Sequence, residues 1–171
     1  MIKRFVKRLF TPREVTFAEL APKLAVVAVL AVVVIQWQSH ILVTVSKSVE
    51  PRIFWKTGEE PSRDDYATFM FEHELAGEEP VRLTKRLACW SGDSLTVTGR
   101  DVYCNDEFLG TAKETGLHGQ DLPRFEFNGV IPNGLAFAVG SHADSFDSRY
   151  WGFVDVSTTE RVVPIFNRKG G

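Results

Sequence analysis

The chain has 171 residues, 44% of them hydrophobic, and a formal net charge of −2. This length suffices for one domain of about 120 to 130 residues with its own core, together with an anchor. Residues 1–23 carry six of the 20 basic and two of the 22 acidic residues, which leaves 14 basic against 20 acidic residues, a net charge of −6, in the remainder. This acidic balance argues against nucleic acid as the main partner.

An unbroken apolar run from Leu24 to Ile35 follows the basic N-terminus. As a helix this run covers only about 18 Å, so it needs extending on both sides to approach a hydrocarbon core of roughly 30 Å. We therefore expect a transmembrane signal anchor over residues 20–38, with residues 1–19 in the cytoplasm and 39–171 in the periplasm. A cleaved signal peptide would also be apolar, but Gln36–His40 is a poor cleavage site. A buried core helix is the other alternative, and the basic residues that flank the run are not expected beside such a helix.

Beyond the apolar run, short β-branched and aromatic stretches alternate with Gly, Pro, Asn and Asp. Short strands with close turns favour a mainly β fold, a small sandwich or barrel of antiparallel pairs. Residues 111–123 are expected to form an irregular loop. We predict strands at 41–47, 52–56, 66–72, 80–89, 94–98, 101–104, 124–128, 135–139, 151–155 and 161–166.

Two cysteines, Cys89 and Cys104, flank a hairpin expected around Gly99. On the outer side of a membrane a disulfide between them forms and persists, although two separate buried thiols are the alternative. The four histidines and the cysteines show no metal-ligand spacing, so neither a metal nor a cofactor is expected.

Ser48 follows the apolar run closely and is a candidate nucleophile. A serine hydroxyl needs a base that removes its proton and a donor that receives the oxyanion. Strand alternation puts Lys85 on one face with Val81, Leu83 and Leu87. Burial there would favour the neutral amine, which could accept the proton, whereas a solvated or ion-paired lysine is the alternative.

A second candidate base is His142, with Asp144 or Asp147 completing a Ser/His/Asp triad. Asp144 is too close to His142 along the chain to orient the ring naturally, although Asp147 could do so.

Several short boxes resemble those of type I signal peptidases. Ser48-Val49-Glu50-Pro51 resembles their Ser-Met-x-Pro box, and the stretch 85–93 resembles their Lys-Arg-x-x-Gly-x-Pro-Gly-Asp box. The stretch 147–154 is similar to a third box, and Asp64-Asp65-Tyr66 is similar to a Gly-Asp-Tyr/Phe box between the first two. The boxes occur in the family's order, and with the anchor the resemblance spans roughly residues 20–155.

The resemblance implies a Ser/Lys-dyad endopeptidase with an antiparallel β-sheet catalytic domain. In this interpretation Ser48 attacks the scissile carbonyl and neutral Lys85 is the general base. Ser46 would donate its hydroxyl to the oxyanion hole beside the Ser48 N–H, and Ser145 would orient the Lys85 amine. Triad chemistry through His142 then becomes unnecessary.

The same resemblance assigns an ion-pair cluster that supports the dyad, made of Arg86, Asp147 and Arg149. The chain also departs from the family boxes: Val49 stands for Met, and Cys89 and Ser91 stand for Gly and Pro. These departures disfavour a housekeeping signal peptidase, which remains an alternative.

Three stretches are instead similar to the conjugative-transfer, TraF-type branch: Ser46-Lys47-Ser48, Ile53-Phe54-Trp55, and Ser141-His142 ahead of Ser145. That branch implies an inner-membrane enzyme that matures a conjugative pilin precursor, cutting after small residues, and some of its members join the new ends into a ring. The expected partners are the lipid bilayer and a prepilin or preprotein. The remaining alternative is a catalytically silent structural subunit of a secretion or conjugation complex.

Overall fold

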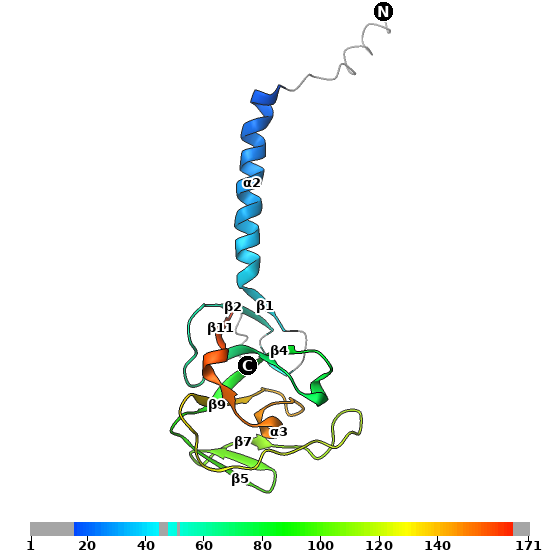
Figure 1. Cartoon of the computed structure of the whole chain (residues 1–171), viewed down its shortest axis with the longest axis vertical. Helices are drawn as coiled ribbons and strands as arrows, with labels where there is room; N and C mark the ends of the chain where they lie inside the picture. Colours follow the sequence, from blue (N-terminus) through cyan, green and yellow to red (C-terminus); the bar gives the residue numbers. More distant parts are fainter. Residues whose placement is uncertain (1–15, 45–47, 51, 166–171) are drawn as a thin grey trace, which may run out of the picture. The chain divides into compact units, whose positions relative to one another are not determined.

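The computed structural model describes residues 16–44, 48–50 and 52–165. Its first element is the helix α2, Phe17–His40, which includes the predicted span 20–38 (Figure 1). At 1.5 Å per residue its 24 residues extend about 36 Å. None of its residues is buried, and within the described part of the chain it is the one helix long and apolar enough to cross a membrane.

A seven-stranded antiparallel sheet forms the larger part of the remaining unit, residues 40–171. Its strand order is β1-β2-β11-β3-β4-β9-β10. The central strand β4 is ten residues long and pairs with β3 on one side and β9 on the other. The strands are β1 Ile41–Val43, β2 Ile53–Lys56, β3 Tyr66–Phe71, β4 Val81–Trp90, β9 Leu135–Val139, β10 Val154–Asp155 and β11 Glu160–Pro164.

A second, four-stranded antiparallel sheet has the order β7-β6-β5-β8. It consists of β5 Ser94–Thr98, β6 Asp101–Cys104, β7 Glu107–Thr111 and β8 Asn128–Val130. A short helix, α3 Ser148–Trp151, precedes β10, and two 3-10 turns cover Glu74–Ala76 and Val156–Thr158. The prediction of a mainly β, antiparallel fold with one N-terminal apolar helix is therefore confirmed.

Most predicted strands agree with the structure to within two residues at each end, and four elements differ more. The predicted strand 124–128 is wrong, since β8 begins at Asn128, and β7 was not predicted at all. The predicted strand 151–155 is split, because α3 ends at Trp151 and only Val154–Asp155 is extended. β1 ends at Val43, and residues 45–47 of that predicted strand lie outside the described residues.

The two sheets share a buried core. One cluster joins Ala88 of β4 and Phe137 of β9 to Leu95 of β5 and Val102 of β6. A second cluster lies within the large sheet and includes Leu87 and residues of β3 and β9. Burying these side chains contributes roughly 25 cal/mol per Å² of apolar surface, so the core fixes β4 between its neighbours.

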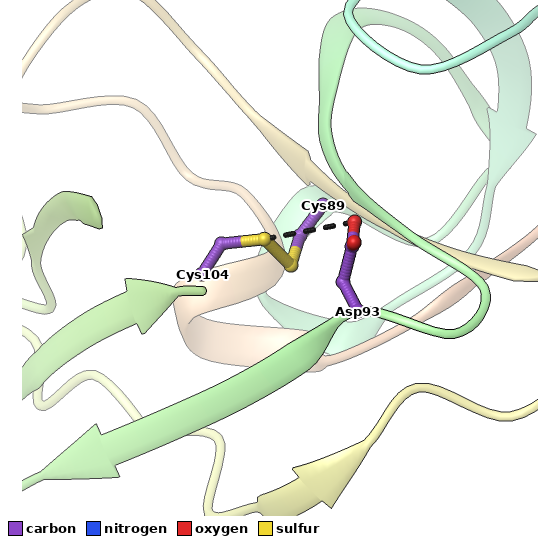
Figure 2. A group of neighbouring side chains, drawn as sticks. All are labelled: Cys89, Asp93 and Cys104. Atoms are coloured by element: carbon purple, nitrogen blue, oxygen red, sulfur yellow. Dashed lines mark hydrogen bonds between the residues drawn. A yellow bond between two sulfur atoms is a disulfide. The ribbon is translucent and has the colours of Figure 1, made fainter. Parts of the chain in front are cut away.

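A disulfide joins β4 to β6, as predicted from the sequence. Cys89 and Cys104 are bonded, with Cα atoms 5.8 Å apart. Figure 2 shows the Asp93 carboxylate directed at this bond, where Oδ2 lies 3.8 Å from the Cys104 Sγ. These three side chains are close enough together to hold a metal ion. A cysteine binds a metal as a thiolate, however, and the two sulfurs are joined in a disulfide, so neither is a thiolate. We therefore interpret the group as a cross-link between strands.

Candidate active site

Lys85 lies in the middle of the large sheet. On β4 it is opposite Ala67 of β3, and the neighbouring Arg86 is opposite Val139 of β9. Its side chain is 1% exposed, in agreement with the alternation that placed it among apolar neighbours. Its Nζ donates a hydrogen bond of 2.6 Å to the Ser145 Oγ, which is also buried.

This burial changes the acidity of the lysine. Removal from water disfavours the ammonium form and lowers the pKa of Lys85 from 10.5 to about 8. The Asp147 carboxylate opposes this shift by favouring the ammonium, and the Arg149 guanidinium adds to it. A measurable fraction of Lys85 is therefore neutral near pH 7 to 8, the state in which an amine accepts a proton.

Asp147 is the fully buried centre of the segment before α3. Its carboxylate is the N-cap of that helix and accepts hydrogen bonds from the Gly140 N–H at 2.9 Å and the Arg149 N–H at 3.2 Å. The Arg149 guanidinium donates to both carboxylate oxygens at 2.8 Å. A buried charge is tolerated only when it is paired and hydrogen-bonded, and this carboxylate satisfies both conditions.

Arg149 extends this ion pair to two further segments. It donates to the Ser145 carbonyl at 3.2 Å and to the Thr111 carbonyl at 3.1 Å. The third member predicted for the cluster, Arg86, is placed differently, because its guanidinium pairs with Asp64. The structure thus brings Asp147 and Arg149 together, whereas Arg86 pairs with Asp64 in the turn before β3.

Residues 48–50, the segment of the predicted nucleophile Ser48, are held by residues 140–142. The Glu50 N–H donates to the Ser141 Oγ at 2.9 Å, and the His142 N–H donates to the Ser48 carbonyl at 3.4 Å. A Cβ atom on Gly140 would meet the Ser145 Oγ and lie 2.6 Å from the Ser48 carbonyl oxygen. Only glycine therefore allows the backbone between β9 and Ser145 to approach Ser48 so closely.

Val49 fixes the same segment from the other side. Its side chain is 1% exposed and packs in a third core cluster with Phe54 and Val162. Ser48 and Val49 lie in a turn, and burying Val49 holds the backbone of this turn against the cluster. Phe54 is fully buried and belongs to this core cluster.

Ser48 and Lys85 line one cavity, of about 300 Å³. This volume is at the lower end of the roughly 300 to 1,000 Å³ typical of ligand sites. Its walls are largely apolar, with the two polar groups of the predicted dyad among them. The other lining residues are Phe71, Leu75, Ala76, Val81, Leu83, Gly116, Leu117, Gln120, Leu122, Asp144, Phe146 and Tyr150.

The ring of the alternative base, His142, makes contacts within its own loop. The His142 Nδ1 accepts a hydrogen bond from the Asp144 N–H at 3.1 Å, and about half of the side chain is exposed. The same nitrogen lies 3.6 Å from the Asp144 carboxylate, but His142 does not line the cavity that contains Ser48 and Lys85. The predicted oxyanion donor, Ser46, and its neighbour Lys47 lie outside the described residues.

The model of the family described as "Signal peptidase, peptidase S26" matches residues 13–163. The chain belongs to this family. The chain is also similar to the crystal structure of a signal peptidase I from Enterococcus faecalis V583, with 24% identity, a TM-score of 0.39, and coverage of 62% of this chain and 98% of that one. No curated protein matches the chain.

Membership of the signal peptidase family makes the chain a serine endopeptidase of the kind that cleaves signal peptides from preproteins. Together with the apolar helix α2, it indicates a membrane-anchored enzyme. The resemblance found in the sequence boxes is therefore confirmed at the level of the family.

Two contacts of this signal peptidase were not predicted from its sequence. The bond between Glu50 and Ser141 joins residues 91 positions apart, and neither side chain type signals it. The Lys113 N–H donates to the Tyr150 hydroxyl at 3.0 Å, so the predicted irregular loop is attached beside the site. Tyr150 lies in the third family box, but its loop partner could be found only from the fold.

Proposed function

We propose that the chain is a membrane-anchored endopeptidase in which Ser48 is the nucleophile and Lys85 the general base. What carries the proposal is that both residues line one cavity while Lys85 is buried, with a pKa lowered to about 8. The Lys85 hydrogen bond to Ser145 holds the amine, and Ser145 is held in turn by Arg149. Asp147 and Arg149 are positioning residues in this proposal.

The reaction proceeds in two halves. The Ser48 Oγ attacks the scissile carbonyl carbon while its proton passes to the neutral Lys85 Nζ. The resulting ammonium gives that proton to the leaving amine, the peptide C–N bond breaks, and an ester on Ser48 remains. Water then attacks the ester, Lys85 again takes the proton, and the product acid leaves as Ser48 recovers its hydrogen.

The oxyanion of each tetrahedral intermediate needs donors. We assign this role to the Ser48 N–H and the Ser46 hydroxyl, following the family boxes. Loss of one such donor typically costs about 100- to 1,000-fold in kcat, so Ser46→Ala should leave low but measurable activity. Ser46→Thr, which keeps a hydroxyl, is the matched variant.

The dyad is tested in membranes that contain the full chain and a labelled precursor. Ser48→Ala and Lys85→Ala should each abolish cleavage, whereas Lys56→Ala should not, because Lys56 is a half-buried lysine of β2 paired with Glu160. Normal processing by either dyad variant would refute the assignment.

For topology and location we infer a bacterial inner-membrane protein with residues 1–19 in the cytoplasm, a span over 20–38 and a periplasmic peptidase domain over 39–171. The basic N-terminus beside an apolar helix supports this orientation. Protease added to spheroplasts should degrade the peptidase domain, and protection from that protease would reverse the topology.

For the substrate we infer a conjugative pilin precursor that is cut after small residues. The support is the likeness of three short stretches to the conjugative-transfer branch, among them Ser141-His142, whose Ser141 contacts the nucleophile segment. Co-expression with pilin precursors encoded nearby, followed by product mass, tests this. Loss of the leader mass shows cleavage, and a further loss of one water shows that the ends are joined.

General preprotein processing is the second candidate, because the matching family is that of signal peptidases. Complementation of a strain depleted of its own signal peptidase separates the two. Growth on complementation would favour the housekeeping role, and failure to complement with successful pilin cleavage would favour the conjugative role.

A further inference from the structure

The segment between β7 and β8 contains a structured projection, which we call the 113–122 arm. At its base the Lys113 N–H donates to the Tyr150 hydroxyl, and the Lys113 Nζ forms an ion pair with Asp144. The Leu122 N–H donates to the Glu114 carbonyl at 2.8 Å. The arm is thus attached to the segment of Ser145 and α3 that holds the proposed base.

The tip of the arm folds back on itself. Thr115 and Asp121 form an antiparallel bridge, and the Gly116 N–H donates to the Gln120 carbonyl at 2.8 Å. The Gln120 side chain accepts a hydrogen bond from the His118 N–H at 3.1 Å. It also packs so closely on Gly116 that a Cβ atom on that residue would clash with it. These local bonds give the tip a defined shape despite its lack of strands.

Leu117 lies at this tip with 80% of its surface exposed. It nevertheless lines the cavity that contains Ser48 and Lys85, together with Leu122 of the arm. Exposing a large apolar side chain to water is unfavourable. A substrate side chain that filled the cavity beside Leu117 would remove the apolar surface of Leu117 from water and so bind more tightly. Phe71 and Phe146 continue the same apolar wall.

We propose that the 113–122 arm is a specificity element, in which Leu117 contacts an apolar side chain of the substrate segment bound in the cavity. This inference rests on the proposed function and adds a recognition site to it. The arm residues that line the cavity carry no titratable group, so the arm acts on substrate choice and not on the proton transfers. A single apolar group in a pocket is worth about 10-fold or more in kcat/KM, which sets the expected size of the effect.

The experiment uses the full chain in detergent micelles and synthetic peptides that span the site cut by the wild-type enzyme. Each residue near the cleavage site is replaced in turn by Leu, Asp or Lys, and kcat/KM is measured. We expect one position at which Leu is preferred to Asp and Lys by about 10-fold or more. Leu117→Asp should remove that preference and improve cleavage of the Lys peptide relative to wild type, a gain that misfolding cannot produce.

Two matched variants complete the test. Leu117→Met should keep the wild-type preference. Val130→Asp should also keep it, because Val130 is an aliphatic residue of β8 with 63% exposure that does not line the cavity. An unchanged preference in Leu117→Asp would overturn the inference, whereas a wild-type enzyme that cuts no precursor, or a Ser48→Ala variant that cuts normally, would overturn the proposed function instead.

Discussion

The Lys85 Nζ donates a hydrogen bond of 2.6 Å to the Ser145 Oγ across 60 positions of sequence. Both groups are 1% exposed, which shields their hydrogen bond from bulk water. An amine that donates one N–H in a fixed direction has the direction of its lone pair restricted as well. In the proposed mechanism, this bond orients Lys85 to accept a proton from the cavity side.

Ser145→Ala should reduce kcat by about 10-fold or more with little change in KM, because it removes the group that orients the base. An acceptor close to the amine favours the ammonium form, so its loss should lower the pKa of Lys85 further below about 8. The rise of activity with pH should accordingly move to lower pH. A pH profile of kcat/KM with a precursor peptide measures both effects.

The control for this variant is Ser148→Ala. Ser148 is equally buried, but its hydroxyl accepts from the Ala138 N–H of β9 and has no bond to Lys85. It should lower stability without moving the pH profile. Equal pH profiles for wild type and Ser145→Ala would exclude the orienting role.

Lys85→Met should abolish activity and yet stabilise the fold at pH 7. Lys85 loses its proton near pH 8 in the folded chain and near 10.5 when unfolded, so the unfolded chain binds more protons between these values and stability rises with pH there. Below pH 8 the buried ammonium costs about 3 kcal/mol, at about 1.36 kcal/mol per pKa unit. Met removes this cost, so its advantage should be largest at pH 7 and decline toward pH 10.5.

Thermal midpoints of the full chain in detergent, measured at pH 7 and pH 10, check this sign. Lys56→Met is the matched control, since Lys56 is a half-buried lysine of β2 whose charge is paired with Glu160. A Lys85→Met variant that is less stable than wild type at pH 7 would contradict a desolvated amine.

The sequence predicts most strands of the fold but not β7. Its hairpin signal is Asn105-Asp106, a two-residue loop between the paired Cys104 and Glu107, with φ of 46° and 69°. Asn and Asp tolerate positive φ, as such tight turns require, so the pair could have marked the hairpin. The four-residue helix α3 carries no helical period, and its start is fixed by the Asp147 cap, a local bond that alternation does not reveal.

At the site, alternation places Lys85 on one face of β4 with Val81, Leu83 and Leu87. This left burial and a solvated or ion-paired lysine both open, and the structure shows that Lys85 is buried. Its contact with Ser145 depends on the pairing of β4 with β9, which places Arg86 opposite Val139. Spacing in the sequence carries no information on that long-range register. The orienting role proposed for Ser145 therefore rests on the family resemblance. The same resemblance grouped Arg86 with Asp147, whereas its guanidinium pairs with Asp64.

Reduction of the Cys89–Cys104 disulfide should destabilise the peptidase domain by about 3 kcal/mol, the loop-entropy value for a separation of 15 residues. The bond joins β4 four residues after Lys85 to β6 of the small sheet, so activity should be lost at a lower temperature while the activity of the folded enzyme remains. Melting of the full chain with and without reductant measures the effect. The double variant Cys89→Ala/Cys104→Ala should have a lowered thermal midpoint with and without reductant. A wild-type midpoint that reductant does not change would contradict the prediction.

Ser141→Ala should reduce kcat by about threefold to tenfold and leave KM nearly unchanged. The Ser141 Oγ accepts the Glu50 N–H at 2.9 Å, two residues after Ser48, so its loss frees the nucleophile segment without touching the cavity wall. Because Lys85 and Ser145 are unaffected, the pH profile should stay in place, unlike that of Ser145→Ala. Ser141→Thr retains the acceptor and should restore kcat. The measurement is kcat and KM of Ser141→Ala, Ser141→Thr and Ser145→Ala with one precursor peptide. A raised KM with normal kcat in Ser141→Ala would assign Ser141 to substrate binding instead.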